Sequence, residues 1–308
     1  MDNNKQILIL EDLGISKELF NSLATELPYS FIWSIEEVDE LSLEGIITIK
    51  TKVDKSLLSL FPNVKFIAVA FTGYDCVDMQ LCEQKQISVY NVPTYSTNSV
   101  AELTLGLAIS LLREIPKANT IMRNGEWALK PGIELAGKTI GIVGTGTIGQ
   151  TTARYFKTMG CNIIGWSRSR RVEFEEIGSY TDSLIELCSQ ADIISVHLPL
   201  TTDTNGLIGE QEIAAMKTSA YIINVARGNI VEETAIIAAL KKNRIAGATV
   251  DVFAQEPINS DSEFLKLPNV ILTPHIAYKT EEALQRRAEV TLDNIKGFIE
   301  GKEVNKVR

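Results

Sequence analysis

Three polar segments in the second half of the chain carry side chains that can bind an anion and transfer a proton. They contain Arg227, Glu256 and His275, and each follows an apolar run typical of a buried strand. Reduction of a 2-keto acid needs its carboxylate held, its carbonyl polarised and a proton supplied. A guanidinium suits the first two tasks, and an imidazole suits the third because it titrates near neutrality. A neighbouring glutamate would orient the imidazole and favour its protonated form.

A glycine-rich segment near the middle of the chain has the spacing of a pyrophosphate-binding turn. Gly144, Gly146 and Gly149 give the pattern G-x-G-x-x-G between an apolar run and a helical pattern. The glycines permit a tight turn, a close approach of backbone to pyrophosphate, and packing of the helix on the strand. The pattern predicts a nicotinamide dinucleotide site, with Thr147 and Ile148 at the helix start also contacting the cofactor.

The segment after the next apolar run bears on which nicotinamide cofactor is bound. NAD-binding proteins usually place an acid there to hold the ribose 2′-hydroxyl, but the first acid in this chain is Glu173. Serines and arginines stand there instead, and they can bind a 2′-phosphate through charge-assisted hydrogen bonds. We expect NADP(H) to be preferred and NAD(H) to be possible; a solvated basic loop is the alternative. The expected phosphate contacts are Ser167, Arg168, Ser169 and Arg170.

The elements that must position these groups alternate between strand-like and helix-like runs. From Lys138 onward, six apolar runs with helical patterns between them predict a dinucleotide-binding sheet. The predicted strands are 139–143, 162–166, 193–197, 221–225, 247–250 and 270–273. The predicted helices are 151–159, 183–188, 211–216 and 233–241. The catalytic candidates follow the last three strands, and ligands of open α/β sheets bind at the carboxyl ends of strands.

The first hundred residues predict a second, smaller doubly wound sheet. Its expected strands are 7–10, 45–49, 66–70 and 88–92, with helices at 17–27, 56–60 and 79–86. Ser99 and Glu102 fit a capping box before a helix that is apolar on nearly every face, which predicts its burial. Pro116 should interrupt that helix.

The predicted fold class is therefore α/β, with two doubly wound parallel-sheet domains and a cleft between them. Residues 98–278 are expected to form a Rossmann dinucleotide-binding domain. Residues 1–97 and 279–308 are expected to form a discontinuous, flavodoxin-like substrate domain, because the last helix, 281–300, can fold back on the first sheet.

Composition excludes several classes of partner. The formal net charge of −9 argues against nucleic acids and anionic membranes, which require a basic face. No run approaches the length of a membrane span, and the chain start does not resemble a secretory signal, so we expect a cytoplasmic protein. The four cysteines form no Cys-x-x-Cys pair, and neither a metal site nor a disulfide framework is predicted.

Over nearly its whole length the chain resembles the D-isomer-specific 2-hydroxyacid dehydrogenase family. Segments 224–228, 251–257 and 268–275 match the family's arginine, glutamate and histidine motifs. The resemblance implies that Arg227, Glu256 and His275 are catalytic. It also implies that Ala226 and Asp251 contact the cofactor, Asp251 through the nicotinamide carboxamide.

Segment 70–75 resembles the family's substrate loop, in which amides around Thr72 and Gly73 would share the substrate carboxylate with Arg227. The resemblance also implies a homodimer formed through the cofactor domain.

Within that family, residues 166–170 look most like glyoxylate and hydroxypyruvate reductases that use NADPH. We therefore expect an oxidoreductase that interconverts small 2-keto and D-2-hydroxy acids. An NAD-dependent D-3-phosphoglycerate dehydrogenase is the alternative within the family, and its phosphorylated substrate would want extra cations, for which Lys50 and Lys52 are the candidates. A nucleotide-sensing, corepressor-like binding protein is the alternative of another class, against which the intact Arg–Glu–His set argues.

Overall fold

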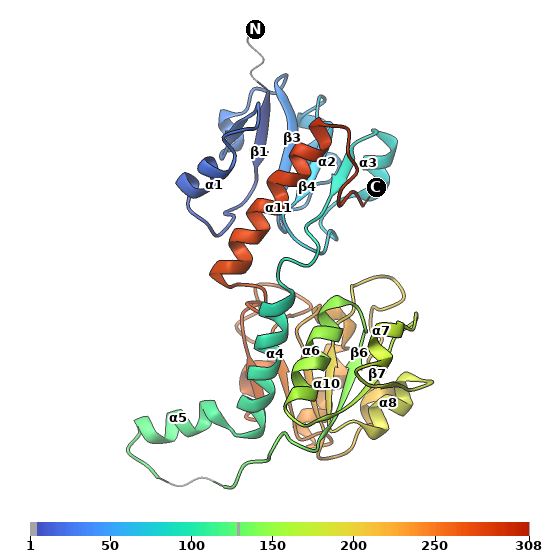
Figure 1. Cartoon of the computed structure of the whole chain (residues 1–308). Helices are drawn as coiled ribbons and strands as arrows, with labels where there is room; N and C mark the ends of the chain where they lie inside the picture. The colour runs from blue at the N-terminus through green and yellow to red at the C-terminus, as the bar shows by residue number, and fades with distance from the viewer. Residues whose placement is uncertain (1–4, 128–129, 308) are drawn as a thin grey trace. The chain divides into compact units, whose positions relative to one another are not determined.

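The computed structural model describes residues 5–127 and 130–307. The chain divides into two compact units, each with its own parallel sheet (Figure 1). Unit 1 contains the chain up to Ser96 and from Lys279 onward, and unit 2 is Thr97–Tyr278. Both units are α/β, as predicted.

Unit 1 is built on a five-stranded sheet with the order β2-β1-β3-β4-β5. Its strands are β1 (Gln6–Ile9), β2 (Ser30–Ile32), β3 (Leu43–Thr48), β4 (Phe66–Val69) and β5 (Ser88–Tyr90). Its helices are α1 (Lys17–Leu23), α2 (Lys55–Leu60), α3 (Met79–Gln84) and α11 (Glu281–Ile299), with a short 3₁₀ turn, η1 (Ile35–Glu37). Helix α11 packs on α1 and β4, where the rings of Phe298 and Phe66 lie 4.5 Å apart. The strand order is that of flavodoxin-like sheets, which confirms the predicted class.

Unit 2 is built on a seven-stranded sheet with the order β12-β11-β10-β9-β6-β7-β8. Its strands are β6 (Thr139–Val143), β7 (Asn162–Trp166), β8 (Ser179–Tyr180), β9 (Ile193–Val196), β10 (Tyr221–Asn224), β11 (Gly247–Val250) and β12 (Val270–Leu272). The order reverses between β6 and β9, which is the switch point at which Rossmann sheets bind dinucleotides.

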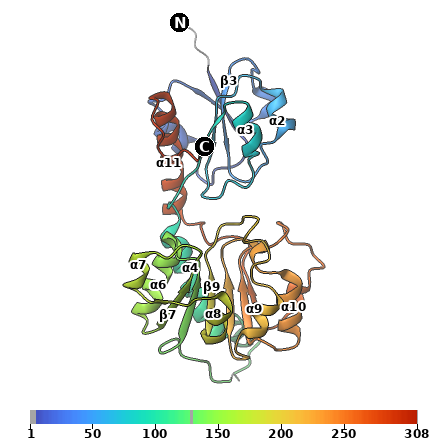
Figure 2. The same cartoon turned by 90° about the vertical axis from the view of Figure 1, so that its right-hand side faces the viewer.

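Helices cover both faces of the unit 2 sheet. They are α4 (Thr97–Leu112), α6 (Thr147–Thr158), α7 (Val172–Glu175), α8 (Leu184–Gln190), α9 (Glu210–Ala215) and α10 (Glu233–Lys241). Unit 2 also contains helix α5 (Ile115–Arg123), in which no residue is buried, and the 3₁₀ turns η2 (Gly228–Ile230) and η3 (Glu263–Lys266). One core forms under α8, α9 and α10 (Figure 2), and the other forms under α4, α6 and α7. Strands that are buried on both faces have continuous apolar sequences, and this pattern made the strands predictable from the sequence.

Several elements differ from the sequence-based expectation: α7 was not predicted, α6 begins at Thr147 rather than at residue 151, and α1 ends at Leu23 rather than at residue 27. Helix α4 begins at Thr97, so Ser99 lies inside its first turn, where it is 5% exposed, and does not cap it. Strands β2 and β8 were not predicted, because they are only three and two residues long and begin with serine. The interruption near Pro116 is confirmed: the backbone turns at Glu114 (φ 48°) and α5 starts with the proline in its first turn.

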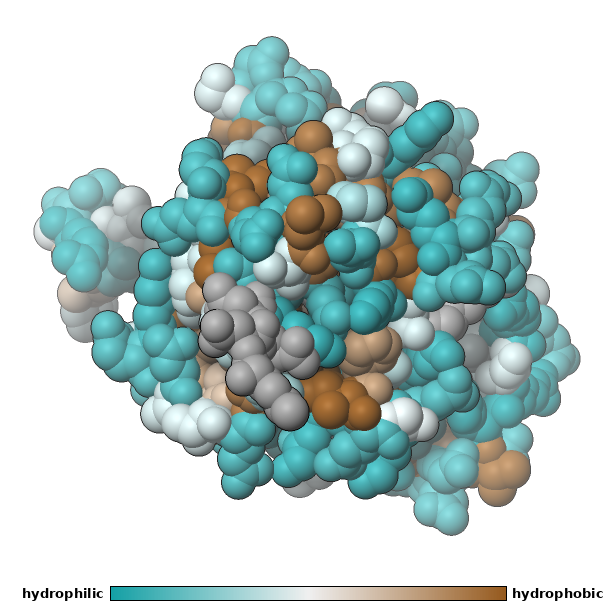
Figure 3. All heavy atoms as spheres, turned by 90° about the horizontal axis from the view of Figure 1, so that it is seen from above, coloured by the Kyte–Doolittle hydropathy of each residue, from teal (hydrophilic) through white to brown (hydrophobic). Residues whose placement is uncertain are grey.

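The surface is largely polar on the face shown in Figure 3, where hydrophobic side chains form small groups among hydrophilic ones. Within the described residues, no helix combines the length and the apolar character needed to cross a bilayer.

Candidate active site

The three catalytic candidates follow three adjacent strands of unit 2. Strands β10, β11 and β12 run in parallel, with Asn224 paired to Val250 and Val250 paired to Leu272. Because the carboxyl ends of parallel strands lie at one edge of the sheet, the loops carrying Arg227, Glu256 and His275 emerge side by side.

His275 and Glu256 form a hydrogen-bonded pair at this edge. Nδ1 of His275 lies 2.7 Å from Oε2 and 2.9 Å from Oε1 of Glu256. An ionised carboxylate can only accept, so Nδ1–H is the donor and Nε2 takes no part in this pair. The side chains are 13% and 28% exposed, respectively. The edge-on ring of Tyr278, 5.7 Å away, also restrains the imidazole. The pair has the geometry of an oriented acid–base group.

The loop that carries His275 is held by Asp251, which is fully buried. Its carboxylate accepts hydrogen bonds from the Thr273 hydroxyl (2.5 Å) and from the backbone N–H groups of Ile276 (2.9 Å) and Ala277 (3.0 Å). Burial raises the pKa of the Asp251 carboxyl, and these hydrogen bonds oppose that rise. The structure thus gives Asp251 a part in shaping the loop, whereas its contact with the nicotinamide carboxamide stays a prediction.

Arg227 occupies a loop that is braced by Asn224 and abuts the glutamate loop. Asn224 Nδ2 donates to the Arg227 carbonyl (3.0 Å), and Asn224 Oδ1 accepts from the Ala226 N–H (3.1 Å). A Cβ on Gly228 would lie 2.0 Å from the carbonyl carbon of Phe253, so only glycine allows this approach. The sequence analysis gave Asn224 no role. Its position as a polar residue at the end of an apolar strand could have indicated that it braces the loop that follows.

The glycine-rich turn has the shape that a pyrophosphate requires. Gly144 has φ 101°, and a Cβ on Gly149 would lie 2.0 Å from the Gly144 carbonyl oxygen. Gly146 is the N-cap of α6, and a Cβ there would meet nothing within 4 Å, so the turn leaves space beside it. The amides of Thr147 and Ile148 open this helix, whose N-terminus attracts negative charge. The residues present therefore fit a dinucleotide.

The segment expected to recognise the 2′-phosphate lies beside this turn. Strands β6 and β7 are paired, and the Gly144 N–H donates to the Trp166 carbonyl (2.8 Å). Arg168 forms an ion pair with Asp203 (3.3 Å) and Arg170 forms one with Asp182 (2.7 Å). All four side chains are more than half exposed, and such surface pairs contribute little. A dianionic phosphate could therefore replace these partners. Ser167 and Ser169 flank Arg168 in the same segment.

His197 and three of the cysteines are poorly suited to act as acids, bases or nucleophiles. His197 follows β9, with Nε2 2.8 Å from the Ser195 hydroxyl, and desolvation lowers its pKa to about 3. Burial raises the pKa of Cys82 and Cys161 to about 11, and that of Cys188 to about 12. These thiols stay protonated and the imidazole stays neutral near neutral pH.

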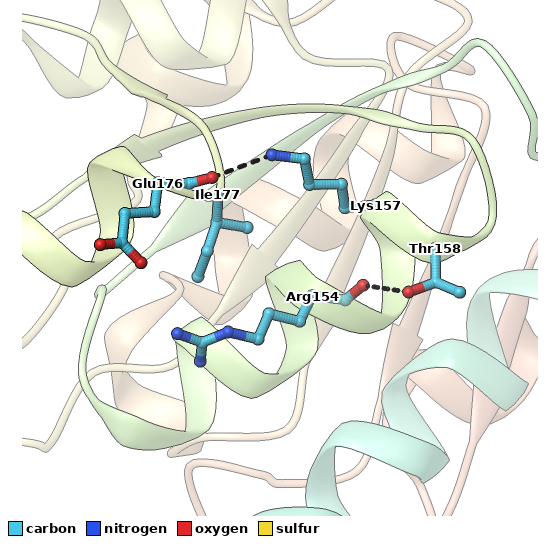
Figure 4. Close-up of a pocket in the computed structure, with 5 residues that line it drawn as sticks. All are labelled: Arg154, Lys157, Thr158, Glu176 and Ile177. Atoms are coloured by element: carbon cyan, nitrogen blue, oxygen red, sulfur yellow. Dashed lines mark hydrogen bonds between the residues drawn. The ribbon is translucent and has the colours of Figure 1, made fainter.

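A surface hollow of about 370 Å³ lies elsewhere on unit 2 (Figure 4). It is lined by Arg154, Lys157, Thr158, Glu176 and Ile177. Lys157 donates to the Glu176 carbonyl (3.0 Å) and the Thr158 hydroxyl donates to the Arg154 carbonyl (2.9 Å). Two of its polar groups are thus engaged with backbone, and its lining includes none of the residues discussed above.

The expected substrate loop belongs to unit 1. Thr72 and Gly73 follow β4, the Thr72 hydroxyl donates to the Val92 carbonyl (3.0 Å), and Asn91 Nδ2 donates to the Thr72 carbonyl (2.7 Å). These bonds fix the backbone of the loop. Binding of a substrate carboxylate by its amides stays a prediction.

Comparison with known proteins agrees with this geometry. The model of the D-isomer specific 2-hydroxyacid dehydrogenase NAD binding domain matches residues 105–277. The D-3-phosphoglycerate dehydrogenase of Methanocaldococcus jannaschii is 39% identical over 299 residues, which are 96% of this chain but only 55% of that relative. The glyoxylate reductase of Thermococcus litoralis is 40% identical over 278 residues, covering 87% of this chain and 83% of the relative.

A solved structure extends the likeness to the whole chain. The NADPH-dependent glyoxylate/hydroxypyruvate reductase from Sinorhizobium meliloti, in complex with NADP and malonate, superposes with a TM-score of 0.87 at 28% identity, covering 99% of this chain and 97% of that one. The family model, the relatives and the paired histidine and glutamate agree. The chain belongs to the D-isomer-specific 2-hydroxyacid dehydrogenase family and is a nicotinamide-dependent oxidoreductase.

Proposed function

We propose that this enzyme reduces a short 2-keto acid, such as glyoxylate or hydroxypyruvate, to the D-2-hydroxy acid with NADPH. The observation that carries the proposal is the His275–Glu256 pair, which lies at the same sheet edge as the glycine turn. Relatives named as glyoxylate reductase and hydroxypyruvate reductase support this substrate class.

Arg227 and His275 divide the proposed reaction between them. When bound, the reduced nicotinamide supplies a hydride to the carbonyl carbon. Arg227 holds the substrate carboxylate and polarises the carbonyl, with amides at Thr72 and Gly73 sharing the carboxylate. The Nε2–H of His275 gives its proton to the carbonyl oxygen, and Glu256 holds the ring and stabilises its cationic form before transfer.

The proposed preference for NADPH rests on the segment after β7. Its serines and exposed arginines can pair with a phosphate, and its first acid, Glu173, lies beyond them in α7. The similarity to the NADPH-dependent reductase from Sinorhizobium meliloti also supports a preference for NADPH. Ala226 and Asp251 would contact the nicotinamide end.

We also propose that the enzyme works as a homodimer in the cytoplasm. Helix α5 projects from the rest of unit 2 (Figure 1) and none of its residues is buried. Its neighbourhood exposes Ile115, Met122 and Trp127, the last at 87%. A nine-residue helix is marginal in water by itself, so packing against a second copy would stabilise it.

A panel of 2-keto acids, assayed with NADPH and with NADH, tests the proposed function. We expect the highest kcat/KM with NADPH and glyoxylate or hydroxypyruvate. Higher kcat/KM with NADH would refute the cofactor preference, and turnover of phosphohydroxypyruvate above hydroxypyruvate would favour a phosphoglycerate dehydrogenase. Cofactor binding with negligible turnover across the panel would indicate a nucleotide-sensing protein instead.

A further inference from the structure

Tyr180 connects the glycine turn to the arginine segment. It lies on β8, the edge strand that pairs with β7. Its hydroxyl is 2.6 Å from the Thr145 hydroxyl, within the glycine motif, and accepts a hydrogen bond from the backbone N–H of Arg171 (2.9 Å). One phenol oxygen therefore links the two segments that the proposed function assigns to different phosphates of the cofactor.

Two packing contacts also restrain the ring of Tyr180. Phe174 packs against it, with ring centroids 4.9 Å apart, and the Arg170 guanidinium lies over it at 5.4 Å. The Thr145 end of the hydroxyl pair is 1% exposed, and a hydrogen bond is electrostatically stronger when it is partly withdrawn from water. Packing and hydrogen bonding together fix the phenol between the two segments.

The consequence is a restraint on the arginines. The backbone of Arg171 is tethered by the hydroxyl, and the side chain of Arg170 is guided by the ring. Donors that are ordered before binding lose less conformational entropy when a phosphate arrives. A tether between the turn and the arginine segment would thus raise affinity for a ligand that carries both phosphate groups.

We propose that Tyr180 is a positioning residue for the cofactor 2′-phosphate, acting through the segment 168–171. This inference rests on the proposed preference for NADPH. Tyr180→Phe would keep the ring and its contacts with Phe174 and Arg170 but remove both hydrogen bonds. KM for NADPH should then rise, while kcat and KM for NADH should change little.

Binding of 2′,5′-ADP and of 5′-ADP to the full chain, measured by calorimetry, tests this without turnover. We expect Kd for 2′,5′-ADP to rise roughly three- to tenfold in Tyr180→Phe, the range for loss of the hydrogen bond that holds the Arg171 backbone, with Kd for 5′-ADP unchanged. Tyr155→Phe is the matched control. Its hydroxyl lies 3.5 Å from Asn98 on another part of unit 2, so both affinities should stay as in the wild type.

The outcomes separate this inference from the function on which it rests. If the wild type prefers 2′,5′-ADP and Tyr180→Phe keeps the full preference, the role of Tyr180 is refuted and the NADPH proposal stands. Equal weakening of both ligands would show a general disturbance of the turn and would also refute the role. If the wild type itself shows no preference for 2′,5′-ADP, the NADPH proposal fails and the role of Tyr180 falls with it.

Discussion

The two histidines of this chain show how a neighbour decides what an imidazole can do. His275 faces a carboxylate, which can stabilise a cation, whereas His197 faces the neutral hydroxyl of Ser195. Desolvation without a counter-charge lowers the pKa of His197 to about 3. The sequence motif singled out His275, and the structure shows that its partner is the carboxylate of Glu256, which suits proton transfer.

His197 should make the stability of the protein depend on pH. Between its unfolded pKa of 6.5 and its folded pKa of about 3, the unfolded chain binds a proton that the folded chain does not. Stability is therefore lost as pH falls below 6.5, by about 1.4 kcal/mol per pH unit from this group. Urea unfolding at several pH values should show a shallower loss for His197→Gln, which does not titrate. An identical slope in both proteins would contradict this prediction.

At the scale of elements, the loops after β10 and β11 must fit together for Arg227 to lie beside the glutamate loop. Gly228→Ala would place a Cβ 2.0 Å from the Phe253 carbonyl carbon, and neither backbone can give way cheaply. We expect a loss of about 1–3 kcal/mol in the free energy of unfolding, together with a fall in kcat/KM.

Gly106→Ala is the matched control for that substitution. A Cβ on Gly106 meets nothing within 4 Å, and the residue lies inside α4. Alanine there should stabilise the helix by about 0.5–1 kcal/mol and leave kcat/KM unchanged. Equal stability and activity in the two variants would show that the close approach at Gly228 is unimportant.

The length and burial of each element explain which parts of the fold could be predicted from the sequence. Buried parallel strands such as β6 and β10 are continuous apolar runs, and the glycine spacing marks the turn after β6, so the sheet and the turn were predictable. The two-residue strand β8 carries no such pattern, and Tyr180 was missed with it. The part that Asp251 plays in holding the histidine loop was missed too, because partners 22–26 residues away are set by the tertiary fold.

At the scale of the whole molecule, the proposed homodimer makes α5 and its surroundings an interface. Trp127→Glu would put a charge on a side chain that is 87% exposed in the single chain, so it should disturb folding little but weaken association. Sedimentation velocity should show a shift from dimer toward monomer. Leu41→Glu, at a 74% exposed position in unit 1, should remain dimeric. A wild-type protein that sediments as a monomer would refute the dimer itself.

The central claim, that His275 supplies the proton, is tested most directly by the turnover of His275→Asn. Asparagine tolerates the left-handed backbone at this position (φ 51°) but cannot transfer a proton, so the fold should persist. Reduction of glyoxylate or hydroxypyruvate with NADPH should show kcat lowered by roughly 10²–10⁴-fold, with Kd for NADPH as in the wild type. An unchanged kcat in this variant would contradict the account.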